Sequence, residues 1–387
     1  MTSDLRFAGR TIFEEEHEAF RALVRDFIDR VRPEYERWEE QHRIDRSFFV
    51  EAGALGLLMF PVEERHGGQG IDDFRFNAVV DEEFARANLG AAGLTIALQN
   101  DVLAPYFVEL TDEAQKERWL PGMVAGETIA AIGMTEPGTG SDLAGIRTAA
   151  RRDGGDWLIS GSKTFISSGQ NADLVIVVAR TSEDRHRGLS LFVVESGMPG
   201  FERGRNLQKL GMHPQDTSEL HFDAVRVPQE NLLGEEGQGF FALMRNLPQE
   251  RMSLAVTAIG ASVGMLEETL DHVTTREAFG QPIGSFQNTR FRFAELAAEV
   301  EIGRTFVDDC VRLLIDGSLS PARAAKAKYW ATELQQRVAH RCLQMFGGYG
   351  YMREYGISRA YADARIQSIY GGTNEIMREI IGKDLGL

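Results

Sequence analysis

The sequence has few cysteines and no long run of apolar residues. Cys310 and Cys342 are the only cysteines among 387 residues, which excludes a disulfide framework and a cysteine-based metal site and fits a reducing compartment. No apolar run reaches the roughly 18 residues that a membrane-spanning helix needs. Residues 1–20 contain no apolar signal core, and their acids argue against a transit peptide. We therefore expect a cytoplasmic protein without membrane insertion.

Basic residues are also in the minority. Asp and Glu number 58 against 42 Lys and Arg, which gives a formal net charge of −16 at pH 7. A surface of that sign repels a phosphate backbone, so we expect no nucleic-acid partner. The 43% hydrophobic and 26% charged residues are ordinary for a folded protein. At roughly 100–200 residues per domain, the length suggests two to three domains.

The motifs of several common enzyme classes are missing. The sequence has no G-x-G-x-x-G that opens a βαβ unit, no G-x-x-x-x-G-K-[ST] loop and no G-x-S-x-G elbow. Its eight histidines show no metal-ligand spacing. A nicotinamide-binding Rossmann enzyme, a P-loop NTPase, an α/β-hydrolase and a zinc enzyme are therefore disfavoured, and we expect no metal.

Hydrophobic periodicity divides the chain into three zones. In residues 13–31 apolar side chains recur every three or four positions, as on one face of a helix, and Pro33 ends that pattern. The following stretches with the same helical character are 46–57, 74–87, 91–106 and 112–123. We expect an N-terminal α-helical domain over residues 1–126.

The middle zone has the alternation and turn residues of strands. Residues 149–152 and 157–160 flank the turn Asp153-Gly154-Gly155 and predict a hairpin. Other strand candidates are 129–134, 174–179, 189–194 and 220–227. Strands without intervening helices favour a small β-sandwich or barrel, which we place at residues 127–235.

Long helical patterns return after residue 237. The stretches 248–276, 287–316 and 322–346 are each about seven turns long, and a shorter helix follows Thr373. Four neighbouring helices favour a C-terminal four-helix bundle over residues 236–387. The predicted fold class is therefore α+β, with a β domain between two helical domains.

Two segments of the middle zone could bind a ligand. The sequence AIGMTEPGTGSD at 131–142 ends a strand and opens a glycine-rich loop whose backbone N–H groups can approach a ligand closely, although an ordinary Pro-Gly turn has the same pattern. In KTFISSG at 163–169, strand alternation puts Phe165 and Ser167 on one side. A flat ring beside a hydroxyl could serve a planar heterocycle, and simple sheet packing would also explain it.

Three segments of the C-terminal zone have a similar double interpretation. Arg276 in REAFGQ can hold a phosphate by two hydrogen bonds, although Arg is also favourable at a helix C-terminus. The glycines of QMFGGYGY at 344–351 allow close approach to a helix end or simply cap it. In YGGTNEI at 370–376, Thr373 fits the N-cap of the last helix.

Together and in this order, these segments resemble the acyl-CoA dehydrogenase family. Residues 134–142 are similar to its first signature and residues 344–376 to its second, and the similarity extends over essentially the whole chain. LPQER at 247–251 and residues 370–377 resemble the long-chain branch most. The resemblance implies an FAD-dependent oxidoreductase that converts a fatty acyl-CoA to the trans-2-enoyl-CoA in β-oxidation and passes electrons to an electron-transfer flavoprotein.

The resemblance also implies where the ligands bind. Phe165 stands where the family usually has Trp, and Ser167 stands where a Thr usually approaches the reactive flavin nitrogen. The implied flavin contacts are Ile132, Met134, Thr135, Gly140, Ser141, Phe165, Ile166, Ser167, Arg276, Phe279, Gln287, Gln344, Met345, Phe346, Gly347, Gly348, Thr373 and Glu375. The implied acyl-CoA contacts are Ser141, Phe241, Pro248, Arg251, Gly371 and Gly372.

Some of these flavin contacts imply an oligomer. By the resemblance, Arg276, Phe279, Gln287 and residues 344–348 reach the FAD of a neighbouring subunit. A site shared in this way needs a second copy of the chain, and the family pattern implies a homotetramer.

The sequence departs from many family members at the catalytic base. These members carry the catalytic Glu directly after the Tyr of the last motif, where this chain has Gly371. The long-chain and isovaleryl branches take the base from the start of a C-terminal helix, and the matching residue here is Glu250. Pro248 suits a first helical turn, where the macrodipole alone would also favour an acid. Glu375, another first-turn acid, is the rival candidate.

Two other functions compete with the dehydrogenase. A flavin oxidase would use molecular oxygen, although oxidases that act on CoA esters are usually much longer than this chain. A flavin-bearing scaffold would have lost its base with Gly371, and the presence of Glu250 argues against it.

Overall fold

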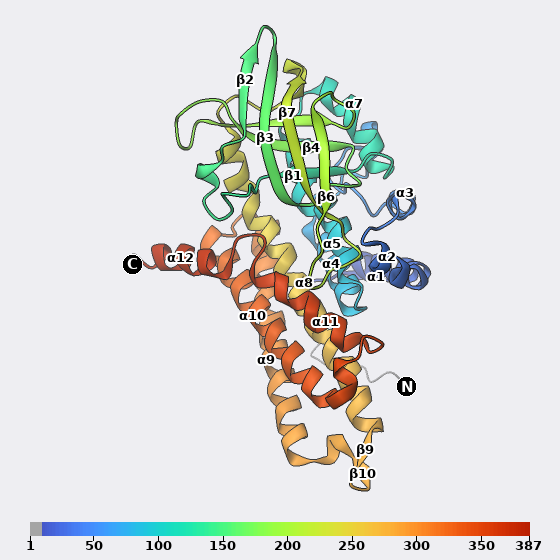
Figure 1. The fold of residues 1–387 in the computed structure, drawn as a ribbon. Coiled ribbons are helices and arrows are strands. Elements are labelled where there is room, and N and C mark those ends of the chain that lie inside the picture. Colours follow the sequence, from blue (N-terminus) through green and yellow to red (C-terminus); the bar gives the residue numbers. More distant parts are fainter. Residues whose placement is uncertain (1–9) are drawn as a thin grey trace.

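The computed structural model describes residues 10–387 and shows three successive regions (Figure 1). Helices come first, an eight-stranded sheet follows, and long helices end the chain. This order confirms the predicted α+β class of a helical, a β and a second helical part. Residues 1–9 of the predicted first domain lie outside the described part.

The N-terminal region is helical, as predicted. Local capping fixes some of its ends: the Asp112 carboxylate accepts the Gln115 backbone N–H, and the Gln115 side chain accepts the Asp112 N–H. The helices are α1 (Glu15–Val31), α2 (Tyr35–Gln41), α3 (Arg46–Ala54), α4 (Phe74–Arg86), α5 (Gly90–Ala97), α6 (Ala104–Glu109) and α7 (Glu113–Val124).

The helix expected over residues 91–106 is interrupted. A π-helical turn, η3 (Leu98–Leu103), separates α5 from α6. Such turns are rare and often occur at functional sites. Here the turn presents Gln99 to the sheet, where its side-chain amide exchanges hydrogen bonds of 3.0 and 3.1 Å with the backbone of Ala130. The hydrophobic periodicity correctly predicted a helical segment but did not predict the π-helical turn within it.

The middle region is one hydrogen-bonded sheet in the order β6-β7-β3-β2-β4-β5-β8, with β1 paired in parallel to β4. The predicted hairpin is present as β2 and β3, with Gly154 at φ 65° in the turn. A strand that we did not predict, β6, lies at one end of this order. The strands are β1 (Ala130–Gly133), β2 (Ala149–Asp153), β3 (Asp156–Ser167), β4 (Leu174–Arg180), β5 (Leu189–Glu195), β6 (Phe201–Asn206), β7 (Thr217–Val227) and β8 (Leu232–Leu233).

The C-terminal region contains the predicted long helices. A small ribbon of β9 (Glu277–Ala278) and β10 (Gln281–Pro282) connects the first two of them. The helices are α8 (Gly239–Thr275), α9 (Gln287–Ile315), α10 (Pro321–Phe346), α11 (Gly356–Ala364) and α12 (Asn374–Asp384). Thr373 caps α12 by accepting the Ile376 N–H, as the sequence predicts.

The expected start of the first long helix at Pro248 was wrong. Helix α8 begins at Gly239, so Pro248 lies inside it. The upstream residues include Leu243, which is fully buried in the N-terminal core, and this packing extends the helix past the missing proline N–H. Glu250 is therefore about three turns from the helix start, beyond the reach of the macrodipole.

Helix α8 links the regions. The N-terminal core packs on one face of the sheet, and a second core joins α8, α9 and α10 with α4. A Cβ at Gly260 would come within 2.7 Å of the Glu82 carbonyl oxygen, so glycine is what allows α8 and α4 to approach this closely. Within residues 10–387, no helix is both long and apolar enough to cross a bilayer.

Candidate active site

Glu250 lies buried on α8. Only 8% of the residue is exposed. Burial raises the pKa of its carboxyl to about 7, against the lowering effects of a hydrogen bond from Tyr106 and of the neighbouring Arg251. Tyr106 Oη donates to Glu250 Oε1 at 3.3 Å. A carboxyl of this pKa is half ionised near neutral pH, which suits a group that accepts and releases a proton.

The Gly371-Gly372 turn packs against the same part of α8. Gly371 has φ +61°, and a Cβ there would lie 2.3 Å from Cδ1 of Leu254, one turn after Glu250. A side chain at this position is therefore opposed both by the backbone conformation and by Leu254. Many family members carry the catalytic Glu side chain at the position of Gly371. Here the Leu254 side chain of α8 occupies that space.

A buried lysine holds this turn. Lys328 Nζ donates to the Gly372 carbonyl at 2.8 Å and to Asn374 Oδ1 at 3.0 Å. Burial lowers the Lys328 pKa to about 7, and the charge of Arg251 acts in the same direction. Arg251 is itself 5% exposed, and within the described residues its Nε has no hydrogen-bond partner. Such an unpaired buried donor is available to a ligand.

Two buried carboxyls lie beside the next turn of α8. Asp81 and Asp101 interact with each other and with the hydroxyl of Ser253, and burial raises both pKa values. Asn77 Nδ2 donates to Asp101 Oδ1 at 2.6 Å. The interior next to Glu250 is therefore more polar than its sequence surroundings on α8 suggested.

The glycine-rich loop after β1 is anchored by an ion pair. Lys163 Nζ lies 2.9 Å from Glu136 Oε1, and the Glu136 carboxylate also accepts the backbone N–H groups of Arg147 and Thr148 at 2.8 Å. Lys163 donates to the Met134 carbonyl as well. Beyond this anchor, Gly140 and Ser141 are exposed, as ligand contacts would be.

Phe165 is held outward from the sheet. The pairing of β3 with β7 shifts between Lys163 and Ile166, and Phe165 has φ +60°. A bulge with a left-handed non-glycine residue is costly and typical of functional sites. Despite the bulge, Phe165 and Ser167 stay on the side away from the core, as the alternation predicts: Phe165 is 67% exposed and Ser167 partly buried, whereas Ile166 packs into the sheet core.

The structure joins the ends of β1 and β3. Thr164 N donates to the Thr135 carbonyl at 2.9 Å, so Met134 and Thr135 lie beside Phe165 and Ser167. Ile132 precedes them on β1. In Figure 1, α12, whose N-cap is Thr373, lies below the sheet.

A second group of predicted residues lies at the other end of α8. Arg276, Gln344, Met345, Phe346, Gly347 and Gly348 line one surface pocket. Phe346 stacks on His272 with ring centroids 4.1 Å apart. Phe279 is 96% exposed in the β9–β10 turn, and Gln287 is exposed at the start of α9. Figure 1 shows β9 and β10 at the end of the molecule opposite the sheet.

The base and the second group lie far apart along α8. Glu250 and Arg276 are 26 positions apart on α8, which corresponds to ~39 Å of helix. The resemblance assigns the second group to the flavin of a neighbouring copy, and this separation fits that assignment.

The remaining predicted residues divide clearly. Phe241 is 43% exposed near the start of α8, and Pro248 and Arg251 flank the base. Glu375 is exposed and pairs with Arg378 at 3.3 Å, and hydrogen bonding from its own N–H lowers its pKa. An exposed acid of low pKa is a poor base, so the structure disfavours the rival.

Sequence reasoning missed Tyr106, Lys328 and the Glu136–Lys163 pair. Each of these residues contacts a partner that is distant in the sequence. Neither the residue type nor the spacing of motifs predicts such a contact. For Lys163 the only available signal was a charged residue within an otherwise strand-like run.

The residues present fit a flavin. An exposed aromatic side chain on a strained bulge suits one face of a flat ring, and the glycine-rich loop begins beside it. The pocket at Arg276 offers a guanidinium and glycine backbone for a phosphate group.

Comparison with known proteins identifies the family. Models of the acyl-CoA dehydrogenase N-terminal, middle and C-terminal domains match residues 14–127, 131–225 and 237–386. The chain is 47% identical over 380 residues to the mitochondrial long-chain specific acyl-CoA dehydrogenase of Sus scrofa, covering 97% of this chain and 88% of that protein.

Solved structures agree with this. The acyl-CoA dehydrogenase from Geobacillus kaustophilus has a TM-score of 0.95 at 44% identity and covers 98% of this chain and 100% of its own. A glutaryl-CoA dehydrogenase from Mycobacterium smegmatis in complex with FADH2 has a TM-score of 0.91 at 29% identity, with 97% and 95% covered. The chain therefore belongs to the acyl-CoA dehydrogenase family, a family of FAD-dependent oxidoreductases, as the sequence predicted.

Proposed function

We propose that this enzyme removes two hydrogens from adjacent carbons of a fatty acyl-CoA, giving the trans-2-enoyl-CoA in the first step of β-oxidation, with Glu250 as the base. The observation that carries the proposal is the buried Glu250 carboxyl with its pKa near 7, beside the Gly371 turn. Glu250 combines burial, a pKa near the neutral pH at which a general base works, and a hydrogen bond from Tyr106 that positions its carboxyl.

Glu250 takes the proton from the carbon next to the thioester. The C–H bond there breaks, its electron pair forms the new double bond, and the proton moves to a Glu250 carboxylate oxygen. When bound, FAD accepts the hydrogen of the adjacent carbon as hydride. Tyr106 donates to the ionised carboxylate and holds it in one orientation.

The Gly371-Gly372 turn binds the thioester. Removal of the α proton builds negative charge on the thioester oxygen, which needs hydrogen-bond donors. The backbone N–H of Gly371 supplies one, and Lys328 fixes the turn by its bond to the Gly372 carbonyl. Ser141, Phe241, Pro248 and Arg251 provide the further acyl-CoA contacts.

The flavin site is shared between two copies. One chain contributes the edge formed by β1, β3 and the start of α12, with the predicted contacts Ile132, Met134, Thr135, Gly140, Ser141, Phe165, Ser167, Thr373 and Glu375, and the backbone of Ile166. The other contributes Arg276, Phe279, Gln287 and residues 344–348. The ~39 Å along α8 between these halves supports the sharing.

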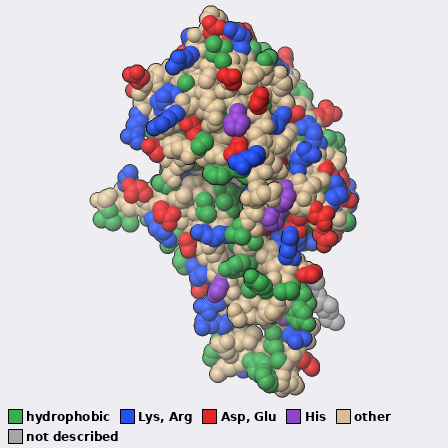
Figure 2. Space-filling model, viewed as in Figure 1, with side chains coloured by type: hydrophobic (Ala, Val, Ile, Leu, Met, Phe, Trp, Pro, Cys, Tyr) green, Lys and Arg blue, Asp and Glu red, His purple; other side chains and the backbone are tan. Residues whose placement is uncertain are grey.

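The assembly is a homotetramer. Large apolar side chains are exposed on the C-terminal region, namely Phe279, Phe291, Ile302 and Tyr351. Figure 2 shows hydrophobic side chains on the lower part of the molecule, which the C-terminal helices form. Apolar groups gathered in this way are typical of a subunit interface.

Further parts of the proposal rest on the family resemblance. The electrons pass to an electron-transfer flavoprotein. The domains run over residues 1–126, 127–235 and 236–387. A cytoplasmic location is supported by the buried free thiols of Cys310 and Cys342.

An anaerobic titration with acyl-CoAs of increasing chain length tests the function. We expect the flavin absorbance to bleach with at least one chain length. A flavin that stays unbleached at every length supports the scaffold instead. Hydrogen peroxide formed at the rate of turnover in air, without an added acceptor, supports the oxidase.

A further inference from the structure

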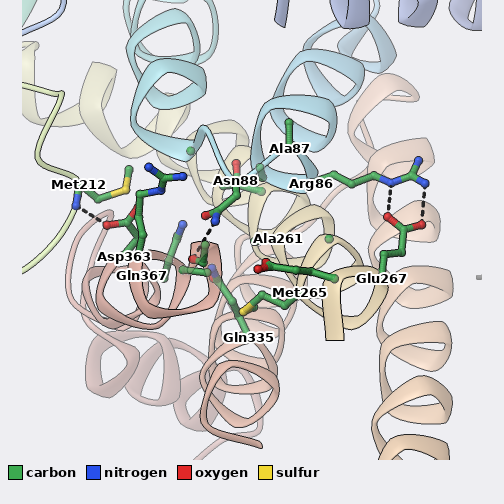
Figure 3. Close-up of a pocket in the computed structure, with 18 of the residues that line it drawn as sticks. Arg86, Ala87, Asn88, Met212, Ala261, Met265, Glu267, Gln335, Asp363 and Gln367 are labelled. Carbon is green, nitrogen blue, oxygen red and sulfur yellow. Dashed lines mark hydrogen bonds and ion pairs between the residues drawn. The ribbon is translucent and has the colours of Figure 1, made fainter. Parts of the chain in front are cut away.

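A cavity of about 390 Å³ lies between α4, α8, α10 and α11, apart from every residue assigned above to FAD or CoA (Figure 3). Its wall includes Ala87, Gly90 and Ala261, which leave room, and Met212 and Met265. This volume exceeds that of a few water molecules.

The cavity lies on the same face of α8 as the base. Glu250, Leu254, Thr257 and Ala261 follow one another at steps of four, three and four residues, so they share one side of the helix. Thr257 and Ala261 line the cavity. They lie ~10 and ~16 Å beyond Glu250 along the helix, at 1.5 Å per residue.

Other segments pack on both sides of this face of α8. On one side α4 packs backbone to backbone, since a Cβ at Gly264 would come within 2.2 Å of the Arg86 carbonyl oxygen. On the other side the chain that contacts Leu254 at Gly371 continues back to Gln367 and Asp363, which line the cavity. An elongated ligand that starts at Glu250 and follows this side of α8 past Leu254 would end at the cavity.

The end of this path is polar. Arg86 binds Glu267 through two hydrogen bonds of 2.6 and 2.8 Å, Asn88 donates to the Gly356 carbonyl at 2.8 Å, and Asp363 accepts the Met212 N–H (Figure 3). In the part of the chain that the structure describes, Oε1 of Gln335, Oε1 of Gln367 and Nε of Arg359 have no partner. Gln335 and Gln367 are only 4% and 2% exposed.

Unpaired buried acceptors call for a donor. The charged groups in the wall balance, because three guanidinium groups face three carboxyl groups: Arg32, Arg86 and Arg359 against Glu267, Glu268 and Asp363. A balanced wall favours a neutral group over a carboxylate or an ammonium. A hydroxyl satisfies the glutamine acceptors and can also accept from the arginine.

Building on the proposed function, we infer that the cavity receives the far end of the acyl chain and selects long acyl-CoAs that carry a hydroxyl there. An extended chain advances ~1.3 Å per carbon, given a C–C bond of about 1.5 Å. It therefore reaches Thr257 near carbon 10, and a chain of 16 carbons places its last carbons in the cavity.

The test compares octanoyl-CoA, hexadecanoyl-CoA and 16-hydroxyhexadecanoyl-CoA by kcat/KM with an artificial electron acceptor. We expect the wild type to prefer the hydroxylated chain about tenfold over the plain one, as for a hydrogen bond that satisfies a buried group. Gln335→Met removes the Oε1 acceptor at similar volume and reduces this preference to within about twofold. Equal rates for both long chains in the wild type overturn the inference.

A second variant tests the path by size. Ala261→Leu fills the cavity, so both long substrates lose about tenfold while octanoyl-CoA stays within about twofold. Ala114→Leu adds the same volume on an exposed turn of α7 and is the matched control. An equal loss with octanoyl-CoA shows a merely structural effect and overturns the path. If no acyl-CoA is oxidised, including octanoyl-CoA, the proposed function itself fails.

Discussion

The two ends of α8 present opposite kinds of site. Near the sheet, Glu250 is buried and receives its positioning hydrogen bond from Tyr106 of its own chain. At the far end, Arg276 and the glycines after α10 form an open surface pocket beside the exposed Phe279. The first end has what proton transfer requires, namely a dry, fixed carboxyl. The second end offers the Arg276 guanidinium and the backbone of Gly347 and Gly348. In the proposed function these groups bind the FAD of a neighbouring copy.

Under the proposed sharing of the flavin site, this difference lets one helix serve two flavins. Chemistry needs groups held within a rigid, packed element, whereas cofactor capture from a neighbour needs an exposed surface that another copy can cover. The same helix spans both and fixes the distance between them.

The largest effect that separates the two ends is expected from Arg276→Glu. Loss of a charge-assisted double hydrogen bond together with like-charge repulsion weakens FAD retention by about 100-fold or more. FAD content after gel filtration measures this. The variant keeps Glu250, so a second chain with an intact Arg276 can restore the activity of a shared site.

Co-expression of Arg276→Glu with Glu250→Gln sharpens the same comparison. In a mixed assembly about a quarter of the sites pair an intact Glu250 from one chain with an intact Arg276 from another. We expect activity well above that of either variant alone. A mixed assembly as inactive as its parents would show that both ends serve one chain.

A smaller effect is expected from Tyr106→Phe, which probes the buried end alone. Tyr106 donates to ionised Glu250, so its loss raises the Glu250 pKa from about 7, by up to about one unit for a single hydrogen bond. The base works when ionised, so the rate of flavin reduction rises with pH through this pKa. The acidic limb of that profile moves to higher pH in the variant, and an unchanged limb contradicts the assignment.

The smallest effect is expected from Glu375→Gln. This acid is exposed and pairs with Arg378. Because Glu375 is not the base, the acidic limb of flavin reduction stays at its wild-type pH, and any loss is confined to a small change in FAD content, since Glu375 is a proposed flavin contact. Loss of the acidic limb in this variant instead would restore Glu375 as the base.

The sequence allowed much of this to be predicted where local chemistry decides. The capped start of α12 at Thr373, the hairpin around Gly154 and the helical, β, helical order follow from residue types and spacing, and the structure confirms them. The start of α8 could not be predicted in this way, because burial of Leu243 outweighs the proline signal.

The site shows the same limit. Glu250 and Gly371 could be selected from motifs. That Leu254 occupies the space beside Gly371, that Tyr106 meets Glu250 and that Lys328 holds the turn depend on contacts between distant segments. Spacing along one helix carries no information about such contacts.

The most direct test of Glu250 as the base is anaerobic reduction of the Glu250→Gln flavin by acyl-CoA, followed by absorbance. Gln has nearly the same shape but cannot accept the proton, so the account predicts normal FAD content and a rate of bleaching lower by roughly 10²–10⁴-fold. Bleaching at the wild-type rate would contradict it.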